Sequence, residues 1–498
     1  MIEHRIKFGT DGWRGITGFN FIDEKIKIIS AGISAYLNKK AGIEKLKIIK
    51  TDGGRVNKNG YLKVVIGYDT RFLSDKFAES AAEVFCKNGI TVYLSDRFIT
   101  SPMLSNAVVR ESADLGIMIT ASHNPYYYNG YKIKGPYGGS ATMDIINMIE
   151  SSVNSIYTNK NFDSLLKNFN SNSAKSSIVK SDFLSPYKSY VLSLIDCDVI
   201  KKNLNFPVLI DPMYGAGQNV FRDILSGLSS SDIYEIHSDI NTSFGGINPE
   251  PIGENLRDAE KFLKDNKCIL ALCIDGDGDR VGAIEENGSF VSSHHIFAIV
   301  LNYLIKFKNL SGKVVKTVTT SSIIDRICLK YGLELVIKPV GFKYISEEIL
   351  SGGVIMGGEE SGGLWIQGYL PERDGIFMGL VLLEALCREG KTAGEILKQI
   401  YNDFGFFVYR RQDYEIENEK KEKIKNLLSG RIPDVLKAEG AGFPITIDGF
   451  KYVLNDGSWI MIRPSGTEAV IRIYAESSTE KKLNYLHLLG RKIIESID

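Results

Sequence analysis

A chain of 498 residues is too long for a single hydrophobic core and predicts three or four domains at roughly 150 residues each. Lys plus Arg equals Asp plus Glu at 60 each, so no net charge would attract a nucleic acid, and any phosphate group must be bound locally. Without an apolar signal region, a run of ~18 apolar residues or a Cys-x-x-Cys pair, the chain is expected to be cytoplasmic, with no disulfides, zinc or membrane contact.

The first block of the chain opens on a glycine-rich loop. Residues 8–15 hold three glycines together with Asp11 and Arg14, which suits a tight loop whose backbone approaches a ligand, although an ordinary Asp-Gly turn has the same composition. The pattern then alternates between helices and strands, which indicates βαβ units on a mostly parallel sheet. The expected elements are a helix near 22–41, a strand at 64–68, a helix from about 76 to 88 and a strand at 91–94.

The candidate chemistry follows a short apolar run at 115–119. Such a run predicts a buried strand, and the pair Asn124-Pro125 forces a turn, which places Ser122 at the mouth of the strand. Open α/β sheets bind their ligands at such strand ends. Ser122 is therefore a candidate nucleophile with His123 as its candidate base, while a turn serine that only bonds nearby backbone is the alternative.

Two features close the first block. Residues 129–134 predict a turn and a strand of alternating side chains, in which Lys132 lies on the face opposite its neighbours. Residues 151–181 are rich in Asn, Ser and Lys, which indicates a domain boundary. The expected domains are 1–165, 185–292, 293–403 and 404–498.

The second block places three carboxylates after a buried strand. Residues 268–274 form an apolar run, and Asp275, Asp277 and Asp279 follow at alternate positions with glycines between them. Such a loop brings hard oxygen ligands round one cation, since glycine lets the backbone fold tightly, and it predicts a Mg²⁺-type site. An EF-hand is the rival, but Arg280 stands where its loop needs glycine, and strands are expected to flank this loop. Asp-Gly turns without a metal are the second alternative.

The third block bears a glycine-rich loop at 357–363 with two glutamates and a serine. It is no phosphate loop, because it lacks the Gly-Lys-Ser/Thr ending and its charge is negative, so its acceptors suit sugar hydroxyls better. Gly390-Lys391-Thr392 is no Walker motif, since Ala385 replaces the first glycine, and Gly390 is interpreted as the C-cap of a helix at 379–387. The other expected elements are helices near 295–307 and 322–331 and a strand at 314–318.

The last block combines a charged helix at 417–428 with two strands, at 459–462 and 470–474. Between the strands lie Ser465, Gly466 and Thr467, and the arginines at 463 and 472 flank them. Hydroxyls, a glycine and arginines form a compact nest that suits a phosphate, while a plain hairpin turn is the alternative.

Taken in this order, the segments at 8–15, 120–125, 275–280, 359–361 and 463–467 closely resemble the motifs of the α-D-phosphohexomutase superfamily, the phosphoglucomutase and phosphomannomutase enzymes. The resemblance covers nearly the whole chain. It implies an α/β fold of three related α/β domains with mixed, mostly parallel sheets plus a smaller C-terminal α+β domain, arranged round a central cleft.

The resemblance also assigns roles to the residues of these motifs. Ser122 would be the phosphoserine, and it would hold Mg²⁺ together with Asp275, Asp277 and Asp279. Arg14, Lys132 and Arg280 would supply further positive charge, and either His123 or Lys132 would move the proton. The substrate-binding set would be Lys343, Glu359, Ser361, Arg373, Arg463, Ser465, Gly466, Thr467 and Arg472.

The implied reaction interconverts a hexose 1-phosphate and a hexose 6-phosphate through a sugar 1,6-bisphosphate, which also acts as a primer. Phosphoglucomutase or phosphomannomutase activity comes first, but the loop at 359–361 leaves glucose, mannose, glucosamine and pentose phosphates open. Ala469 stands where the family loop most often has proline, which is expected to loosen that loop without removing its ligands. The implied partners are small sugar phosphates, and the protein is expected to be a monomer or a homodimer.

Two other classes of function remain open at this stage. A Mg²⁺-dependent phosphatase would use the same serine and carboxylates but would hydrolyse the phosphoserine. A sugar-phosphate binder without catalysis would not need the acidic loop, the nucleophile and the phosphate nest together. Because the sequence retains all three, catalysis is favoured.

Overall fold

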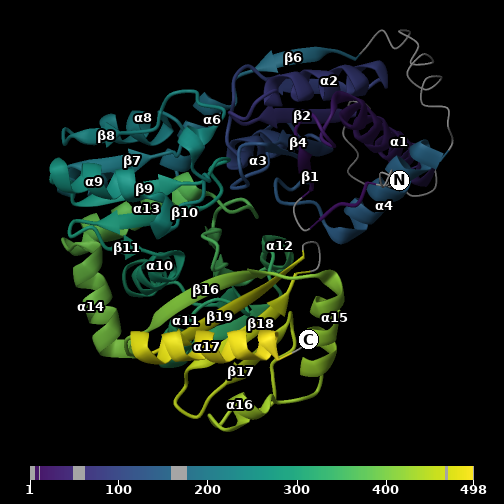
Figure 1. Ribbon diagram of the computed structural model, residues 1–498. Helices are drawn as coiled ribbons and strands as arrows, with labels where there is room; N and C mark the ends of the chain where they lie inside the picture. Colours follow the sequence, from purple (N-terminus) through teal and green to yellow (C-terminus); the bar gives the residue numbers. More distant parts are fainter. Residues whose placement is uncertain (1–5, 10–11, 49–61, 159–175, 466–468, 497–498) are drawn as a thin grey trace. The chain divides into compact units, whose positions relative to one another are not determined.

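The structure, a computed structural model, describes residues 6–9, 12–48, 62–158, 176–465 and 469–496. Its strands form four sheets (Figure 1). By internal contacts the chain divides into two compact units. Unit 1 comprises Met1–Ser293, Ser346–Gly352 and Ser361–Thr392, and unit 2 comprises His294–Ile345, Gly353–Glu360 and Ala393–Asp498.

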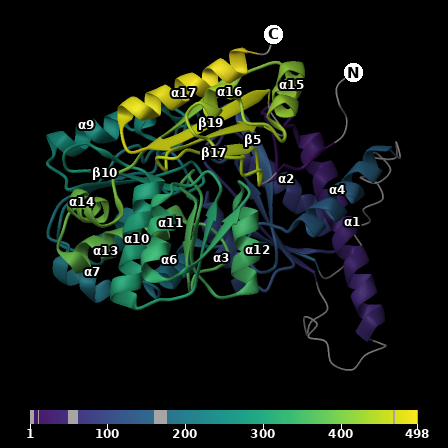
Figure 2. The ribbon, with the colours of Figure 1, turned by 90° about the horizontal axis from the view of Figure 1, so that it is seen from below.

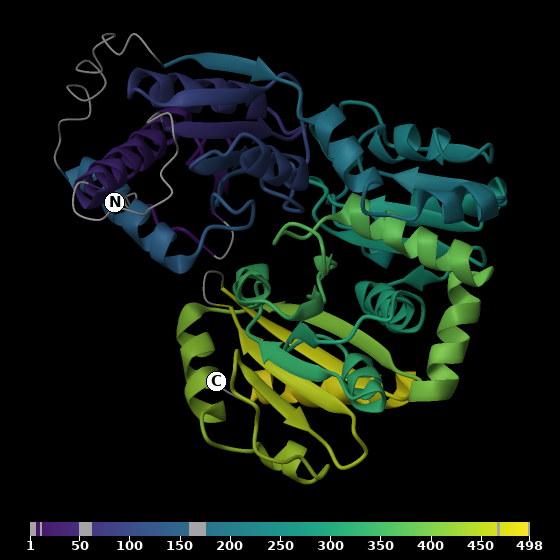
Figure 3. The same cartoon turned by 180° about the vertical axis from the view of Figure 1, so that it is seen from behind.

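The first sheet, in unit 1, has six strands in the order β1-β5-β4-β2-β3-β6. The strands β4, β2, β3 and β6 run parallel, and β5 pairs antiparallel with β4 on one side and with β1 on the other. The edge strand β6 comes from the Asn- and Ser-rich segment, of which residues 159–175 lie outside the described part (Figures 1 and 3). The bounds are β1 Trp13–Ile16, β2 Lys63–Tyr68, β3 Thr91–Ser95, β4 Leu115–Ile119, β5 Tyr128–Lys134 and β6 Ile178–Ser181.

Helices bury both faces of this sheet. On β2, Val64 and Ile66 enter the core shared with α1, α2 and α4, while Val65 points to the other face, where α3 packs. Parallel strands covered on both sides have continuous apolar runs, which explains the wholly buried β4 ahead of Ser122. The long α1 lies beside α4 (Figure 2). The helices are α1 Asp23–Ile48, α2 Ser74–Lys87, α3 Ser101–Arg110 and α4 Met143–Thr158.

The second sheet of unit 1 has the order β11-β10-β9-β7-β8. The strands β9, β7 and β8 are parallel, and β9 turns back into β10 as an antiparallel pair. The strands are β7 Val208–Asp211, β8 Ile233–Glu235, β9 Leu270–Ile274, β10 Val281–Glu285 and β11 Phe290–Val291. The helices are α6 Leu184–Leu192, α7 Cys197–Asn203, α8 Val220–Ser226, η1 Phe244–Gly246, η2 Gly253–Asn255 and α9 Arg257–Asp265.

A helix from much later in the chain completes this part of unit 1. The helix α13 (Gly375–Glu389) packs on β9, β10 and α7. It begins where the Asp374 side chain accepts the amides of Ile376 and Phe377, and it ends at Gly390, whose φ of 62° is the left-handed conformation that glycine adopts readily. The C-cap predicted at Gly390 is confirmed.

The third sheet has the order β13-β12-β14-β15, with β12 parallel to β13 and to β14. The fourth sheet, in unit 2, is antiparallel throughout and has the order β16-β19-β18-β17. The strands are β12 Lys313–Thr317, β13 Glu334–Lys338, β14 Val354–Gly358, β15 Leu364–Ile366, β16 Val408–Glu415, β17 Phe450–Val453, β18 Trp459–Pro464 and β19 Val470–Ser477. The helices are α10 Ser293–Lys308, α11 Ile323–Tyr331, α12 Phe342–Ser351, α14 Ala393–Phe404, α15 Asn418–Leu428, α16 Asp434–Lys437 and α17 Glu480–Glu495.

The two faces of the fourth sheet differ in character. Ile460 and Ile462 face α17, which lies along the sheet (Figures 1 and 2) and shares their core. Trp459 and Met461 point to the other face and pack with Tyr474 and Val318. These sheets and helices confirm the predicted class of three α/β blocks followed by a C-terminal α+β block. The predicted arrangement round a cleft stays a prediction.

Lys451 is buried on that second face. Its Nζ lies 3.7 Å from the centre of the Trp459 ring and donates to the Val318 carbonyl at 2.9 Å. Burial, together with repulsion from Lys316, lowers the pKa of Lys451 to about 7. Because the unfolded chain would bind this proton up to a pH near 10.5, folding releases it at neutral pH and above.

The pH dependence of stability should therefore carry the signature of Lys451. A folded-state pKa that lies below the unfolded value makes the free energy of unfolding rise with pH, by about 1.4 kcal/mol per unit above pH 7. Urea unfolding of the protein and of Lys451→Met at pH 7, 8 and 9 should show this slope as the difference between them. Lys437→Met, at an exposed position of α16, is the control, and an equal slope in all three proteins would contradict the assignment.

Candidate active site

Ser122 lies in the loop that follows β4, where the sequence predicts it. Its backbone adopts a left-handed φ of 55°, which is uncommon for a residue with a side chain. The Ser122 amide donates to Thr120 Oγ1 at 2.9 Å, and the Asn124 amide closes the turn on the Ala121 carbonyl at 3.1 Å. The serine is fully buried within unit 1, so its hydroxyl faces protein groups that can control its chemistry.

The acidic loop connects β9 to β10 and meets the Ser122 loop. Ser122 Oγ donates to Asp275 Oδ2 at 2.8 Å. Gly276 permits the approach, because a Cβ at that position would lie 2.6 Å from the Ser122 carbonyl oxygen. Strands flank the loop, which confirms the reason given for rejecting an EF-hand.

The carboxylates of Asp275, Asp277 and Asp279 are fully buried and offer ligand oxygens within 4.8 Å of one another. Burial, and repulsion from Asp279 and Asp277, raise the pKa of Asp275 well above its usual value. Asp279 Oδ1 accepts no hydrogen bond from the residues that the structure describes. A hard divalent cation would supply the missing contact and would offset the repulsion among the carboxylates, so these residues fit such an ion.

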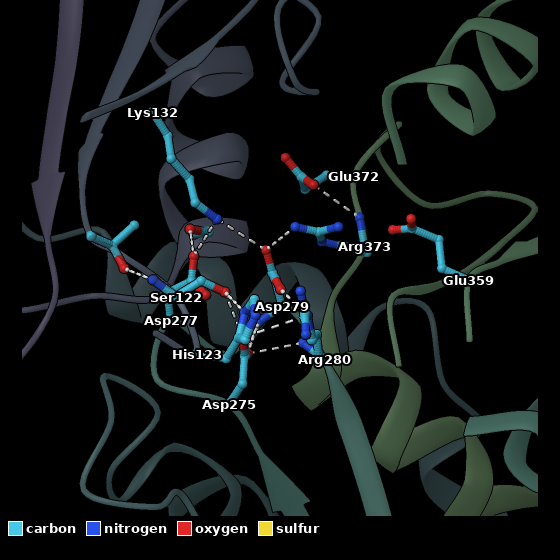
Figure 4. Close-up of polar contacts among 12 residues, drawn as sticks. Ser122, His123, Lys132, Asp275, Asp277, Asp279, Arg280, Glu359, Glu372 and Arg373 are labelled. Carbon is cyan, nitrogen blue, oxygen red and sulfur yellow. Dashed lines mark hydrogen bonds and ion pairs between the residues drawn. The ribbon is translucent and has the colours of Figure 1, made fainter. Parts of the chain in front are cut away.

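Basic side chains surround the carboxylates (Figure 4). Lys132 Nζ, on β5, lies 2.8 Å from Asp277 Oδ2 and 3.3 Å from Asp279 Oδ2. Arg373 Nη2 lies 2.8 Å from Asp279 Oδ2. Arg280 Nε lies 3.9 Å from both Asp275 Oδ2 and Asp279 Oδ1. The site therefore combines a serine hydroxyl, three carboxylates and three cations within unit 1.

His123 contacts the serine, and Lys132 contacts the carboxylates. His123 Nδ1 lies 3.4 Å from Ser122 Oγ, and its Nε2 lies 4.0 Å from Glu250 Oε1. The same Glu250 oxygen accepts from Arg280 Nη1 at 2.9 Å. One carboxylate thus lies between the histidine and an arginine, which restricts the orientation of both.

Arg14 reaches the serine loop from the neighbouring strand β1, and its Nη1 donates to Asn124 Oδ1 at 2.5 Å. Behind the cations, Lys134 forms a buried ion pair with Glu372. Glu372 Oε1 also accepts the amide of Arg373 at 3.2 Å, so this pair fixes the backbone that carries Arg373.

The predicted sugar loop belongs partly to unit 2. There Glu359 Oε1 accepts the Gly341 amide at 2.9 Å, next to the start of α12, which carries Lys343. Glu360 accepts from Thr319 at 2.5 Å and from Thr317 at 3.2 Å. Ser361 belongs to unit 1 and is partly buried.

The predicted phosphate loop lies between β18 and β19 of unit 2. Arg463 and Arg472 stand opposite each other on these strands, and Asp413 of β16 continues the row. Arg463 Nε lies 3.0 Å from Asp448 Oδ2, and Arg472 Nε lies 3.3 Å from Asp413 Oδ2. Like charges directly opposite each other destabilise a sheet, which suits a place where an anion binds. Ser465 is buried, while Gly466 and Thr467 lie outside the described residues.

Four residues of unit 1 that contact the site are not among the residues predicted from the sequence: Arg71, Ser101, Glu250 and Glu372. The Ser101 hydroxyl donates to Asp277 Oδ2. Arg71 carried a usable signal, because Asp69-Thr70-Arg71 directly follows a buried strand, where ligands and catalytic groups gather. Glu250 and Glu372 lie in loops, and their sequence neighbourhood does not indicate their partners.

Models of one protein family match four segments that together make up most of the chain. Family models described as phosphoglucomutase/phosphomannomutase, alpha/beta/alpha domains I, II and III, match residues 5–160, 185–288 and 292–404. The model of the C-terminal domain of the same family matches residues 416–487. Among the helices of the described residues, none is both long and apolar enough to cross a membrane.

Named relatives cover nearly the full length of the chain. The chain is 32% identical to a "Phosphoglucomutase" of Komagataeibacter xylinus, over 96% of this chain and 88% of the relative. It is 30% identical to a "Probable phosphoglucosamine mutase" of Pyrococcus abyssi, over 98% and 97% of the two chains. The crystal structure of a "putative phosphomannomutase" from Thermus thermophilus superposes with a TM-score of 0.81 at 28% identity, over 98% and 99%.

Proposed function

The chain belongs to the phosphoglucomutase/phosphomannomutase family, and from this membership and the geometry at Ser122 we propose that it interconverts hexose 1-phosphates and hexose 6-phosphates. Ser122 would carry a phosphoryl group between turnovers, and a sugar 1,6-bisphosphate would be both intermediate and primer. The observation that carries the proposal is the 2.8 Å contact from Ser122 Oγ to Asp275 inside a ring of carboxylates and cations.

The reaction would consist of two phosphoryl transfers. In the first, the bond between phosphorus and Ser122 Oγ breaks as a bond forms to the free hydroxyl of the sugar monophosphate, and the proton of that hydroxyl ends on the serine. The bisphosphate then returns its other phosphoryl group to Ser122, and the proton moves in the opposite direction. Phosphoryl transfer passes through a loose transition state whose charge lies on the equatorial oxygens, so positioned cations are the main requirement.

Asp275, Asp277 and Asp279, with an oxygen on Ser122, would hold Mg²⁺, which when bound neutralises charge on the transferring group. Lys132 and Arg373, at 2.8 Å from the same carboxylates, would bind the remaining phosphoryl oxygens together with Arg280. His123 contacts Ser122 Oγ at 3.4 Å, which favours it over Lys132 as the group that handles the serine proton. Arg14 would hold the serine loop through Asn124.

The predicted sugar loop and the predicted phosphate loop would recognise the rest of the substrate. Glu359, with Ser361 and Lys343, would contact the sugar hydroxyls, and the Arg463–Arg472 row with Ser465, Gly466 and Thr467 would bind the phosphate that does not react. The names of the relatives span glucose, mannose and glucosamine, and we propose glucose and mannose phosphates as the first substrates to test. The cytoplasmic location and the monomer or homodimer expected from the sequence stay predictions.

Replacing Arg463 by alanine should raise the KM for sugar phosphate by roughly tenfold or more, since a charge-assisted phosphate contact contributes about 1.5–3 kcal/mol. The phosphate already on Ser122 should remain. Steady-state kinetics with intact-mass measurement checks both points, and Arg431→Ala, an exposed arginine of unit 2, is the control. Loss of the phosphoserine with an unchanged KM would contradict the assignment of this loop.

The test of the function is an assay of glucose, mannose and glucosamine 1-phosphates with Mg²⁺ and a catalytic amount of the matching bisphosphate. A mutase conserves phosphate and forms the 6-phosphate. Release of inorganic phosphate in proportion to turnover would identify a phosphatase instead. Binding of the sugar phosphates in calorimetry with neither product would identify a binding protein.

A further inference from the structure

The side chain of Arg71 packs against the backbone of the Ser122 loop. Arg71 follows β2, which pairs in parallel with β4, so the ends of these two strands are neighbours. Its side chain is fully buried and donates to three carbonyl oxygens of the Ser122 loop and to one at the start of β5. Its Nη2 donates to the oxygens of Ser122 and Asn124, each at 2.6 Å, and its Nη1 donates to those of Pro125 at 2.9 Å and Tyr128 at 3.1 Å.

The guanidinium is itself held firmly. Its Nε lies 3.2 Å from Asp69 Oδ2, and Asp69 Oδ1 accepts the Arg71 amide at 3.0 Å and the Ser74 hydroxyl at 2.8 Å. The Phe244 ring covers the guanidinium at 4.8 Å from its centre. A buried charge held by a partner carboxylate, an aromatic ring and four acceptors has little freedom to move.

The Ser122 loop needs such a support. The left-handed backbone of Ser122 is a conformation that a serine leaves readily unless its surroundings impose it. Carbonyls that converge on one point repel each other, and only a planar fork of N–H donors can satisfy all of them at once. An amine at position 71 would provide a charge but not this fork.

We propose that Arg71 is a positioning residue for the phosphoryl transfer: by binding three carbonyls of the loop and the Tyr128 carbonyl of β5, it fixes Ser122 in the conformation that aims Oγ at the carboxylates and the substrate. The inference rests on the proposed mutase function. Arg71 contacts backbone oxygens, and its effect on the reaction passes through Ser122. A change of about 1 Å in the position of a reacting group can cost 10²-fold in rate, so the effect should be on the transfer step.

The test measures single phosphoryl transfers from pre-phosphorylated full-length enzyme to glucose 1-phosphate in rapid quench. Arg71→Ala and Arg71→Lys should both transfer about 100-fold more slowly than the wild type, while the KM for sugar phosphate changes by less than about threefold. Low millimolar guanidinium should restore the rate of Arg71→Ala, because it can refill the site between Asp69 and the loop carbonyls. Methylammonium, a cation without the fork, should not.

A matched variant separates positioning from stability. Val92→Ala removes a buried side chain from β3 of the same sheet, and its melting temperature should fall while its transfer rate stays near that of the wild type. Transfer at the wild-type rate in Arg71→Lys, or a loss in Arg71→Ala that guanidinium does not reverse and that Val92→Ala matches at an equal melting temperature, would overturn the inference. If the wild-type phosphoenzyme itself transfers nothing to sugar phosphates, the proposed function fails instead.

Discussion

Replacement of Ser122 by alanine should lower mutase turnover by at least about 10⁴-fold, because the variant has no oxygen to carry the phosphoryl group. Ser122 Oγ is the hydroxyl that donates to Asp275, at 2.8 Å, and its burial excludes water from the reacting group. Intact-mass measurement of the wild type should show a phosphate-sized increment after incubation with bisphosphate. The increment should be absent from Ser122→Ala.

Ser95→Ala is the control, since Ser95 is a buried serine of β3 in the same unit and has no place in the proposed mechanism. It should keep both the phosphate increment and most of the turnover. A phosphate found reproducibly on another residue of the wild type, or a phosphorylated Ser122→Ala, would refute the role of Ser122.

Asp277→Asn should weaken Mg²⁺ binding and lower kcat by about a hundredfold or more, because a charged ligand of a hard cation contributes several kcal/mol to charge stabilisation. In the structure Asp277 lies with Asp275 and Asp279 in one buried cluster. Titration calorimetry with Mg²⁺ gives the affinity independently of activity. Excess Mg²⁺ should recover part of the lost turnover.

The matched control is Asp211→Asn, which removes an equally buried carboxylate that pairs with His237 and lies outside the cluster. This variant should bind Mg²⁺ like the wild type. Full activity of Asp277→Asn in metal-depleted buffer would contradict the proposal that these carboxylates bind a metal ion needed for the reaction.

Local pattern was enough to predict much of the fold. The apolar run at 115–119 forms β4, and the turn at Asn124-Pro125 leaves Ser122 at its end, as predicted. Both features were predictable because the burial of a strand and the formation of a turn depend on residues that are adjacent in the sequence. Packing between distant elements was not accessible in this way. The sequence predicts a helix at 379–387, which lies within α13, but it does not indicate that this helix packs on β9 and β10.

The same distinction between local pattern and distant packing applies to the residues of the candidate site. Asp275, Asp277 and Asp279 share one loop, so their spacing predicted that they would converge. Arg71 and Glu250 reach Ser122 and His123 only through the tertiary fold, from segments far away along the chain. The left-handed backbone of Ser122 was also unpredictable, since tertiary contacts impose it against the local preference of serine.

The most direct test of the account follows the fate of one phosphoryl group. Enzyme labelled with radioactive phosphate on Ser122 is mixed with a stoichiometric amount of unlabelled glucose 1-phosphate or mannose 1-phosphate in the presence of Mg²⁺ and quenched within one turnover. The label should leave the protein and appear in the sugar bisphosphate and then in the 6-phosphate, with none of it as inorganic phosphate. Label that remains on the protein, or that is released as inorganic phosphate at the rate of its loss from Ser122, would contradict a mutase that works through this serine.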